Sequence, residues 1–368
     1  MAASSSVTTS SLPLIHYLAG TFCWSPSQPL NPSRRSVLVS SRYNFVFVAW
    51  GEEFFCAPIP LLLELAAPNL DVLKLEKGTK GPHLHWFASS VPTEGICISP
   101  DESIIVATFG EIVCFLDTSR LLQQPLEESI IWTVHNPRLS VRDMIWLKDT
   151  CYILWSDGSL MATRPHRKYC RQLLAWSKAI RLGSLTASGM ISLASAKGQI
   201  FCFDPQSGLH FPEFPLSSQQ REMLLGDQHG ILKAQTGEKV LLWDVAEHKG
   251  RWIQEEMSQS VYLEANIWGS ELVSMAWDDL NRAIFAMDSA GCLSVFLQVD
   301  PCWFSRMSLT DAELTRRAQS IAVLARTMNQ ISRMEAKMTT LRVGFEKYIS
   351  ELGSDIQQVM LSFMKTDE

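Results

Sequence analysis

The chain has 368 residues, of which 46 % are hydrophobic and 19 % charged, and its formal net charge is −6. This composition excludes a chain that is mostly disordered, because disordered chains are poor in apolar residues and rich in net charge. The negative balance argues against a general nucleic-acid binder, which is usually basic. The chain contains no run of about 18 apolar residues, so the sequence predicts no membrane-spanning helix.

Residues 1–34 form a leader rich in serine and proline, which we expect to be disordered. No acidic residue occurs before Glu52, and Arg34, Arg35 and Arg42 follow the Ser/Thr-rich start. That composition also resembles an organelle transit peptide, so the sequence leaves both interpretations open.

Six glycines, each between two apolar runs, recur along residues 35–304. They are Gly51, Gly110, Gly158, Gly198, Gly237 and Gly291, at intervals of 59, 48, 40, 39 and 54 residues. A strand, a glycine turn and a second strand form a β-hairpin. A hairpin repeated about every 40–50 residues is typical of a β-propeller, with one four-stranded blade per repeat. We therefore predict an all-β propeller of six or seven irregular, WD40-like blades.

Two departures from a regular repeat are expected. The apolar run Pro58–Ala67 in the first blade is suited to one or two helical turns. The interval between Gly237 and Gly291 has room for a seventh blade, because residues 261–268 and 271–277 both look like strands.

The nine cysteines form no C-x-x-C pair. Four of them, Cys97, Cys114, Cys202 and Cys292, lie inside apolar strand runs. We expect these to be small buried hydrophobic residues in a reducing compartment. The spacing predicts neither a disulfide framework nor a zinc site.

Arg164, His166, Arg167, Lys168 and Arg171 form the one basic cluster, which we expect on a loop after a strand that ends at Ala162. A solvated loop is the simplest interpretation. The functional alternative is a patch that binds a partner through an acidic protein surface or a phosphate backbone.

A C-terminal helix is predicted within residues 305–368, starting at a capping box formed by Thr310 and Glu313. Its heptad pattern predicts a coiled-coil seam, interrupted by Glu335 and Arg342. The apolar seam residues are Ile321, Leu324, Met328, Ile331, Met338, Phe345, Ile349, Leu352, Ile356, Val359 and Phe363. Such a helix is roughly 80 Å long. We expect it to form an intermolecular coiled coil; the alternative is that it packs back on its own propeller.

The predicted propeller and the C-terminal segment differ in net charge. Residues 305–368 hold nine Lys/Arg and eight Asp/Glu, so of the chain's −6 they carry +1 and the propeller side carries −7. An acidic platform suits a partner with a basic surface.

The sequence contains no nucleophile elbow, phosphate-binding loop, zinc-protease motif or dinucleotide fingerprint. His83 and His85 could share a strand face, but no carboxylate or cysteine lies at metal-ligand spacing. We therefore predict no catalytic residue, no metal and no cofactor, and expect a non-enzymatic docking protein. An enzyme with catalytic groups in the propeller channel stays as a further hypothesis.

Several passages resemble one known family. The run Ser36–Trp50 is similar to the first propeller blade of the cytoplasmic-filament nucleoporins. Residues 96–103 and 115–122 resemble the second blade, and residues 141–158 resemble the third. The likeness keeps the same order along residues 37–204, roughly half of the chain.

The resemblance implies a propeller that docks a DEAD-box RNA helicase at the nuclear pore for mRNA transport, and coiled coils that bind other pore subunits. It implies a location in the nuclear pore complex, with the cytoplasm as the alternative. Partners would be proteins, with no direct nucleic-acid contact and no membrane insertion. The chain departs from the family in having a single Phe-Gly pair, Phe109-Gly110, so no part in the permeability barrier is expected. A second hypothesis is a propeller and coiled-coil subunit of a trafficking, centrosomal or cell-cycle complex.

Overall fold

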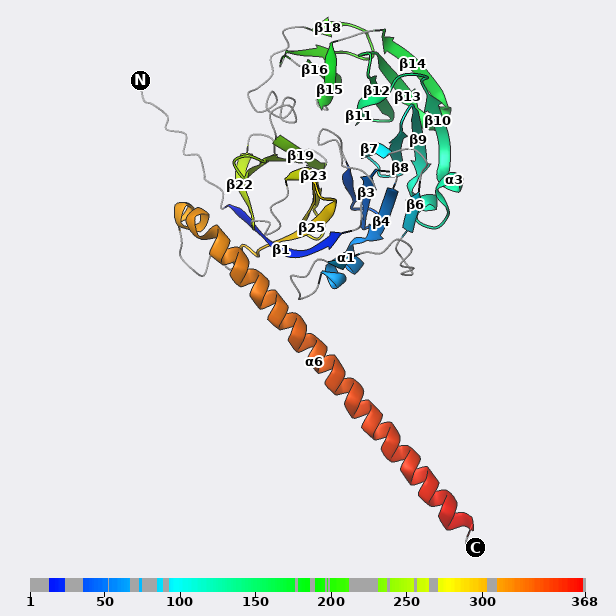
Figure 1. The fold of residues 1–368 in the computed structure, drawn as a ribbon, viewed down its shortest axis with the longest axis vertical. Helices are drawn as coiled ribbons and strands as arrows, with labels where there is room; N and C mark the ends of the chain where they lie inside the picture. The colour runs from blue at the N-terminus through cyan, green and yellow to red at the C-terminus, as the bar shows by residue number, and fades with distance from the viewer. Residues whose placement is uncertain are drawn as a thin grey trace.

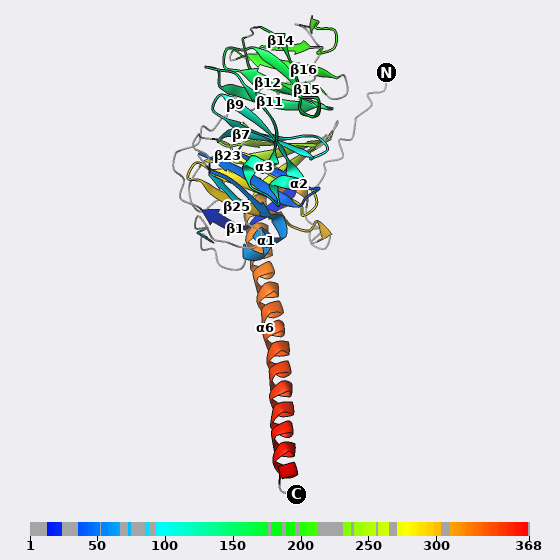
Figure 2. The same ribbon diagram turned by 90° about the vertical axis from the view of Figure 1, so that its right-hand side faces the viewer.

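The computed structural model shows a ring of small sheets from which one long helix projects (Figure 1). It describes residues 13–23, 36–51, 53–66, 73–74, 85–88, 93–175, 178–185, 189–195, 197, 199–211, 231–236, 239–254, 257–264, 271–302 and 310–366. Figure 2 shows the helix, α6 (Asp311–Thr366), leaving the propeller on one side. The prediction of an all-β propeller followed by a long C-terminal helix is confirmed.

Four antiparallel sheets are each one complete blade. The first contains β2 (Val37–Ser40), β3 (Phe45–Trp50), β4 (Glu53–Pro58) and β6 (His85–Ala88). The second contains β7 (Thr93–Ile98), β8 (Ile104–Phe109), β9 (Ile112–Asp117) and β10 (Ile130–His135). The third contains β11 (Val141–Leu147), β12 (Thr150–Trp155), β13 (Leu160–Arg164) and β14 (Tyr169–Leu174). The fourth contains β15 (Ala179–Leu185), β16 (Met190–Ser195), β17 (Ile200–Phe203) and β18 (His210–Phe211).

A fifth, nine-stranded sheet contains two further blades. One is β19 (Ile231–Thr236), β20 (Lys239–Asp244), β21 (Lys249–Gln254) and β22 (Met257–Leu263). The other is β23 (Leu272–Asp278), β24 (Ala283–Asp288), β25 (Cys292–Gln298) and, as its fourth strand, β1 (Leu14–Cys23). The two join because β1 also pairs with β22, and β5 (Leu73–Lys74) adds to β1. The described residues thus form six four-stranded blades.

Short helices connect some strands. The predicted turns after Pro58 are helix α1 (Ile59–Leu65). In the second blade, α2 (Thr118–Leu121) and α3 (Leu126–Ser129) lie between β9 and β10. In the third, the 3₁₀ turn η1 (Pro165–Arg167) leads into β14. None of the described helices is both long and apolar enough to cross a bilayer.

The glycine turns lie where the sequence predicted hairpins. Gly51, Gly110, Gly158 and Gly291 have φ of 56°, 58°, 83° and 83°, which is the left-handed region that favours glycine. Gly198 and Gly237 lie outside the described residues, although the strands on either side of each pair as a hairpin.

The uneven spacing of the glycines has a simple origin. Five of the six turns join the second and third strands of a blade, but the turn at Gly237 joins the first and second strands of the fifth blade. The interval from Gly237 to Gly291 is filled by β20 to β24. That interval leaves no room for a seventh blade, so of the six or seven blades predicted, the described residues form six.

At five of the six junctions between neighbouring blades the first strands contact one another, so they line the centre of the ring. These contacts join β2 with β7 and β23, β7 with β11, β11 with β15, and β19 with β23. The fourth strands consequently form the outer rim. This places β10, β14, β22 and β1 on the outside of the propeller.

Part of the predicted leader belongs to the propeller. Residues 1–12 and 24–35 lie outside the described residues, but Leu14–Cys23 are strand β1, so the expectation of a disordered leader over 1–34 is wrong for this stretch. The strand pairs antiparallel with β25 from His16 to Cys23 and thereby completes the last blade with the start of the chain. Paired backbone groups and buried side chains compensate the entropy lost in ordering it.

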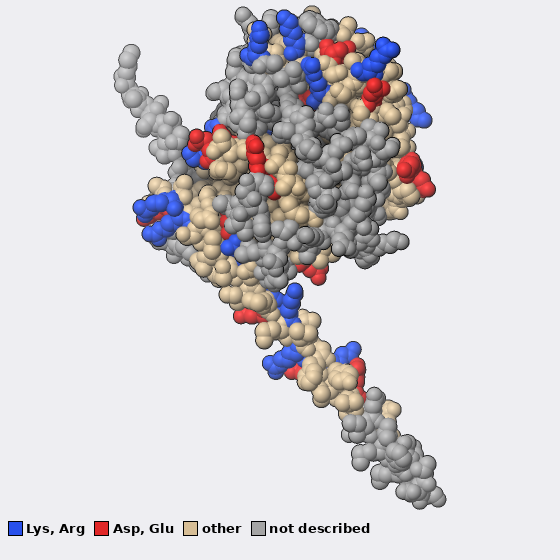
Figure 3. All heavy atoms as spheres, in the orientation of Figure 1, with Lys and Arg blue, Asp and Glu red and all other residues tan. Residues whose placement is uncertain are grey.

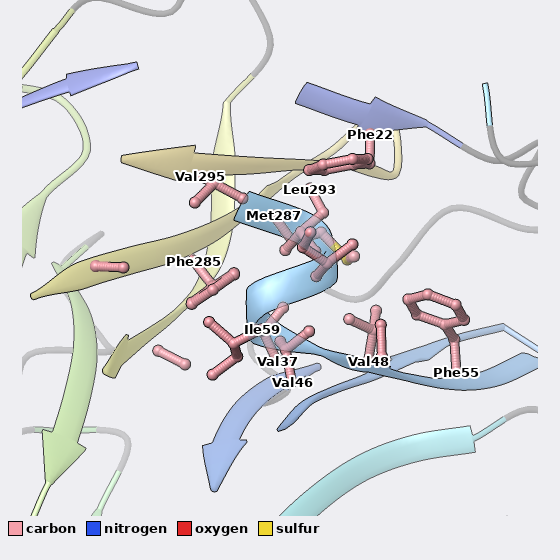
Figure 4. Packing of buried hydrophobic residues seen from close by; sticks show 14 of the residues in the cluster. Phe22, Val37, Val46, Val48, Phe55, Ile59, Phe285, Met287, Leu293 and Val295 are labelled. Carbon is pink, nitrogen blue, oxygen red and sulfur yellow. The ribbon is translucent and has the colours of Figure 1, made fainter. Parts of the chain in front are cut away.

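The N-terminal strand is held by a close-packed cluster between the first and last blades. Phe22 is fully buried there with Ile59 of α1, and with Met287 and Leu293 of the last blade (Figure 4). Strand β1 has a bulge between Leu18 and Gly20. A Cβ on Gly20 would lie 2.7 Å from the Cβ of Ala66, so only glycine fits this approach of β1 to the end of α1.

A disulfide also links this strand to its neighbour. Cys23 and Cys292 are directly paired across β1 and β25 and are bonded, which corrects the expectation that Cys292 is a free buried residue. Cys97, Cys114 and Cys202 are buried free cysteines, as predicted. Burial raises the pKa of the Cys114 thiol to about 11, so it is protonated at neutral pH.

One buried histidine makes the closure of the ring sensitive to acid. His16 of β1 is fully buried, and its ring lies edge-on to Trp277 with 5.5 Å between the ring centroids. Burial lowers the pKa of His16 to about 3, because the charged imidazolium cannot be solvated there. The native protein therefore holds His16 neutral, whereas the unfolded chain protonates it below about pH 6.5.

We expect the free energy of unfolding to fall as the pH is lowered from about 6.5 toward 3, by up to ~1.4 kcal/mol per pH unit from this residue. Urea unfolding at pH 7.5, 6 and 5 measures the slope, and His16→Phe should flatten it. Burial raises the pKa of Glu264, so this carboxyl group stabilises the folded protein as the pH falls, which is opposite to the effect of His16. The contribution of His16 is therefore the difference in pH slope between the His16→Phe variant and the parent chain. Equal slopes in the two proteins would contradict a neutral buried His16.

Candidate docking surfaces

The basic cluster lies on the outer rim of the third blade. β13 ends at Arg164, η1 turns the chain, and β14 carries Arg171. The expectation that the whole cluster is on a loop is therefore corrected: Arg164 and Arg171 are on strands, and only His166, Arg167 and Lys168 lie in the turn. Figure 3 shows Lys and Arg side chains over the third and fourth blades, and around the start of α6.

Local geometry brings the cluster together. Pro165 is buried and anchors the turn, and Lys168 has φ of 49°, which reverses the chain within three residues. In the register of β13 and β14, Arg164 pairs with Tyr169, and Arg171 lies two residues further along. Directly paired residues share a face of the sheet, and so do residues two apart in a strand. Arg164, Tyr169 and Arg171 thus lie on one face, beside the exposed turn.

The five residues are not equally available to a partner. Arg164 Nε donates to Thr150 Oγ1 at 3.0 Å and lies 3.5 Å from Asp149 Oδ2, so this side chain is held by its own blade. His166, Arg167, Lys168 and Arg171 are exposed, and so is the neighbouring Tyr169. Several cations beside an exposed aromatic ring are typical of protein interfaces.

The same side chains also protect a strand edge. Among the described strands β14 pairs only with β13, so one row of its backbone groups is left unpaired by them. Charged side chains on such an edge disfavour pairing with strands of other molecules. This is the simplest explanation for Arg171, and it is compatible with a docking role for the turn.

The first turns of α6 are a second surface, already occupied by the propeller itself. The predicted capping box is present: Glu313 Oε2 accepts from Thr310 N at 3.0 Å, and Glu313 N donates to Thr310 Oγ1 at 3.4 Å. From there, apolar side chains pack on Ile15, Tyr17 and Val299 beside β1. They are Leu314, Ala318, Ile321, Ala322 and Ala325.

A buried ion pair closes this contact. Arg326 Nη1 lies 2.6 Å from Glu264 Oε1, and Glu264 is only 3 % exposed. The other oxygen of Glu264 accepts from Leu18 N at 2.8 Å. Tyr262 also bonds to Gln319 of the helix. One carboxylate therefore ties together the helix, β1 and the end of β22.

Beyond Arg326 the helix leaves the propeller (Figure 1). This free part carries a stripe of exposed apolar side chains. Of the predicted seam, Ile321 is buried against the propeller. Exposed seam residues are Leu324, Met328, Ile331, Met338, Phe345, Ile349 and Leu352. The side chains of Ile356, Val359 and Phe363 lie outside the described part. Met334, Leu341 and Tyr348 are also exposed, although the sequence analysis did not select them.

In the described part of the chain, no group of three or more His, Cys, Asp or Glu side chains could hold a metal ion. The fold and its surfaces define a WD40-type propeller scaffold with a rim patch and a projecting helix.

The similarity to known proteins is one of fold. No protein-family model and no curated protein sequence matches the chain. A structure of S. cerevisiae Dbp5 bound to Nup159 and Gle1 matches at a TM-score of 0.53 and 11 % identity, covering 78 % of this chain and 96 % of the matched chain. The N-terminal domain of Nup159 matches at 0.50 and 10 % identity, covering 78 % and 96 %. The mitotic checkpoint complex matches at 0.51 and 10 % identity, covering 77 % and 92 %.

Proposed function

We propose that this chain is a non-enzymatic scaffold of the nuclear pore, whose propeller docks a partner protein and whose helix anchors it to other subunits. The observation that carries the proposal is the free part of α6, which projects from the propeller with its apolar stripe exposed. An apolar stripe of this length needs a partner, because exposed apolar area is costly in water.

The nuclear pore is favoured by a likeness of sequence. Residues 37–204 resemble the first blades of the cytoplasmic-filament nucleoporins, and a Nup159 domain is among the matching folds. The resemblance to that family implies a DEAD-box RNA helicase as the docked partner and a role in mRNA transport, and a structure of Dbp5 bound to Nup159 is among the matching folds. We propose the nuclear envelope as the location and the rim cluster of the third blade as the contact.

Charge reversal in the rim cluster tests the docking surface. The triple variant Arg167→Glu, Lys168→Glu, Arg171→Glu should reduce capture of the partner at least roughly tenfold in proximity labelling. The thermal midpoint should stay within about 2 °C, because substitutions of exposed side chains rarely cost more than ~0.5 kcal/mol. Arg120→Glu, Lys197→Glu, Lys249→Glu gives the same charge change at exposed sites elsewhere and is the matched control. Equal losses in both variants would contradict a specific patch.

A second candidate is a propeller subunit of a cell-cycle, trafficking or centrosomal complex in the cytoplasm. It is supported by the match to the mitotic checkpoint complex, which is as close as the matches that contain Nup159. Labelling of the tagged full chain separates the two. Nucleoporins and a DEAD-box helicase among the labelled proteins support the first proposal, and proteins of another assembly support the second.

A further inference from the structure

The free part of α6 carries an uninterrupted apolar seam that differs in phase from the predicted one. Its seven side chains alternate at spacings of three and four, which is the pattern of a coiled-coil seam. They are Ile331, Met334, Met338, Leu341, Phe345, Tyr348 and Leu352, with exposed fractions of 43–72 %. In this phase Glu335 and Arg342 flank the seam instead of interrupting it. The seam is roughly 30 Å long.

This seam points away from the propeller. The side chains that pack on β1 lie at Leu314, Ala318, Ile321 and Ala325. An α-helix turns by about 100° per residue. Around the helix axis, the mean direction of these four side chains and that of the seam side chains in 331–352 therefore differ by roughly 180°. The propeller therefore cannot cover the seam, and a second helix could lie along it without meeting the blades.

We propose that a second copy of this chain occupies the seam, with its helix antiparallel to the first. In a register that overlaps six of the seven seam residues and leaves out Leu352, Ile331 lies opposite Tyr348 of the second copy. Met334 then lies opposite Phe345, and Met338 opposite Leu341. Each layer combines an aromatic or large side chain with an aliphatic one, whereas a parallel pair would stack Phe345 on Phe345 and Tyr348 on Tyr348.

The flanking charges determine the orientation. In the antiparallel register, Glu335 lies beside Arg342 of the second copy, and Arg342 lies beside its Glu335, so symmetry gives two opposite-charge pairs. In a parallel, in-register pair, Lys337 would lie beside Arg342 of the second copy, which is a like-charge contact. Flanking residues of this kind set partner choice and orientation in coiled coils. The charge pattern therefore complements itself only when the helices run in opposite directions.

Sedimentation of the full chain over a range of concentrations tests the proposal. We expect a concentration-dependent dimer that Arg342→Glu weakens roughly tenfold, since both pairs become like-charged. Glu335→Arg should have the same effect, and the double variant Glu335→Arg, Arg342→Glu should restore the dimer. The double variant, like Arg342→Glu, lacks the contact within one helix between Arg342 Nε and Glu346 Oε1 at 2.9 Å. A dimer restored in the double variant therefore shows that the charge pairs between the two helices, and not this contact, control dimerisation.

Disulfide trapping reports the orientation directly. In a background with the exposed cysteines replaced (Cys170→Ser, Cys302→Ser), chains with Ile331→Cys are mixed with chains carrying Tyr348→Cys. The antiparallel register predicts cross-links between the two kinds of chain, and little between like chains.

Two results would overturn the proposal. A chain that stays monomeric at about 100 μM has no self-association of useful strength. A dimer that Arg342→Glu strengthens, or that cross-links like chains through Ile331→Cys, is parallel. Both results concern the chain's own association and leave the labelling test of pore membership unaffected, so failure of this inference is distinguishable from failure of the proposed function.

Discussion

Truncation after Thr327 is expected to leave the thermal midpoint of the propeller within about 2 °C of the full chain, whereas truncation after residue 308 should lower it by on the order of 10 °C. The two chains differ only in the first turns of α6. Those turns bury Leu314 and Ile321 against β1 and supply Arg326 to Glu264. Beyond them the helix has no apolar contact with the propeller among the described residues.

The magnitude of that second effect follows from the lost burial and the lost charge. Full burial of a large aliphatic side chain contributes about 1.5–3 kcal/mol, and two are lost. Removing one partner of a buried ion pair costs about 3–5 kcal/mol, because the remaining charge is left unpaired. After the truncation water reaches Glu264 and reduces the cost of its unpaired charge. We therefore expect the free energy of unfolding to fall by about 5 kcal/mol in total.

Differential scanning calorimetry of the three chains gives the midpoints. Arg326→Met in the full chain separates the ion pair from the apolar contact, and should account for a part of the loss. The double variant Arg326→Met, Glu264→Gln should be more stable than Arg326→Met alone, since no unpaired carboxylate remains. Equal thermal midpoints for the chains truncated after residue 308 and after Thr327 would show that the first turns of α6 do not stabilise the propeller.

Phe22→Ala is expected to cost about 3–5 kcal/mol, the largest effect of any single substitution discussed for this protein. Phe22 is fully buried where the first and last blades meet, and it lies on the strand that completes the last blade. The cavity would weaken both the packing of α1 and the pairing of β1 with β25. Deleting residues 1–24 removes the whole strand and should prevent cooperative folding of the propeller.

Urea unfolding in reducing buffer is the measurement, because the bond from Cys23 to Cys292 would otherwise hold the weakened strand in place. Leu280→Ala is the matched control: it removes a large side chain that is 66 % exposed, and should change the free energy of unfolding by about 0.5 kcal/mol or less. A normal cooperative transition in the chain without residues 1–24 would show that β1 is not needed to close the ring.

Local patterns made the blades predictable, and long-range pairing did not. A glycine hairpin such as that around Gly110 is specified by about twelve neighbouring residues, so it is visible in the sequence. Strand β1 was missed because its partner β25 lies far along the chain: the bonded Cys23 and Cys292 are 269 residues apart. Nothing in a serine-rich leader indicates which distant strand will pair with part of it.

The seam of the helix was partly mispredicted for a related reason. The predicted seam includes Ile321, which the propeller buries. The free part also exposes Met334, Leu341 and Tyr348, which the prediction did not include. A sequence pattern shows that side chains are apolar at helical spacing, but it does not show which of two partners covers each of them.

Imaging of the tagged chain in its own cells tests membership of the nuclear pore, comparing the full chain with the chain truncated after Thr327. We expect the full chain to mark the nuclear rim and the shortened chain, which keeps its folded propeller, to become diffuse. A full chain that marks the cytosol or an organelle, with no signal at the rim, would contradict the nuclear-pore assignment. A shortened chain that stays at the rim would contradict the anchoring role of α6.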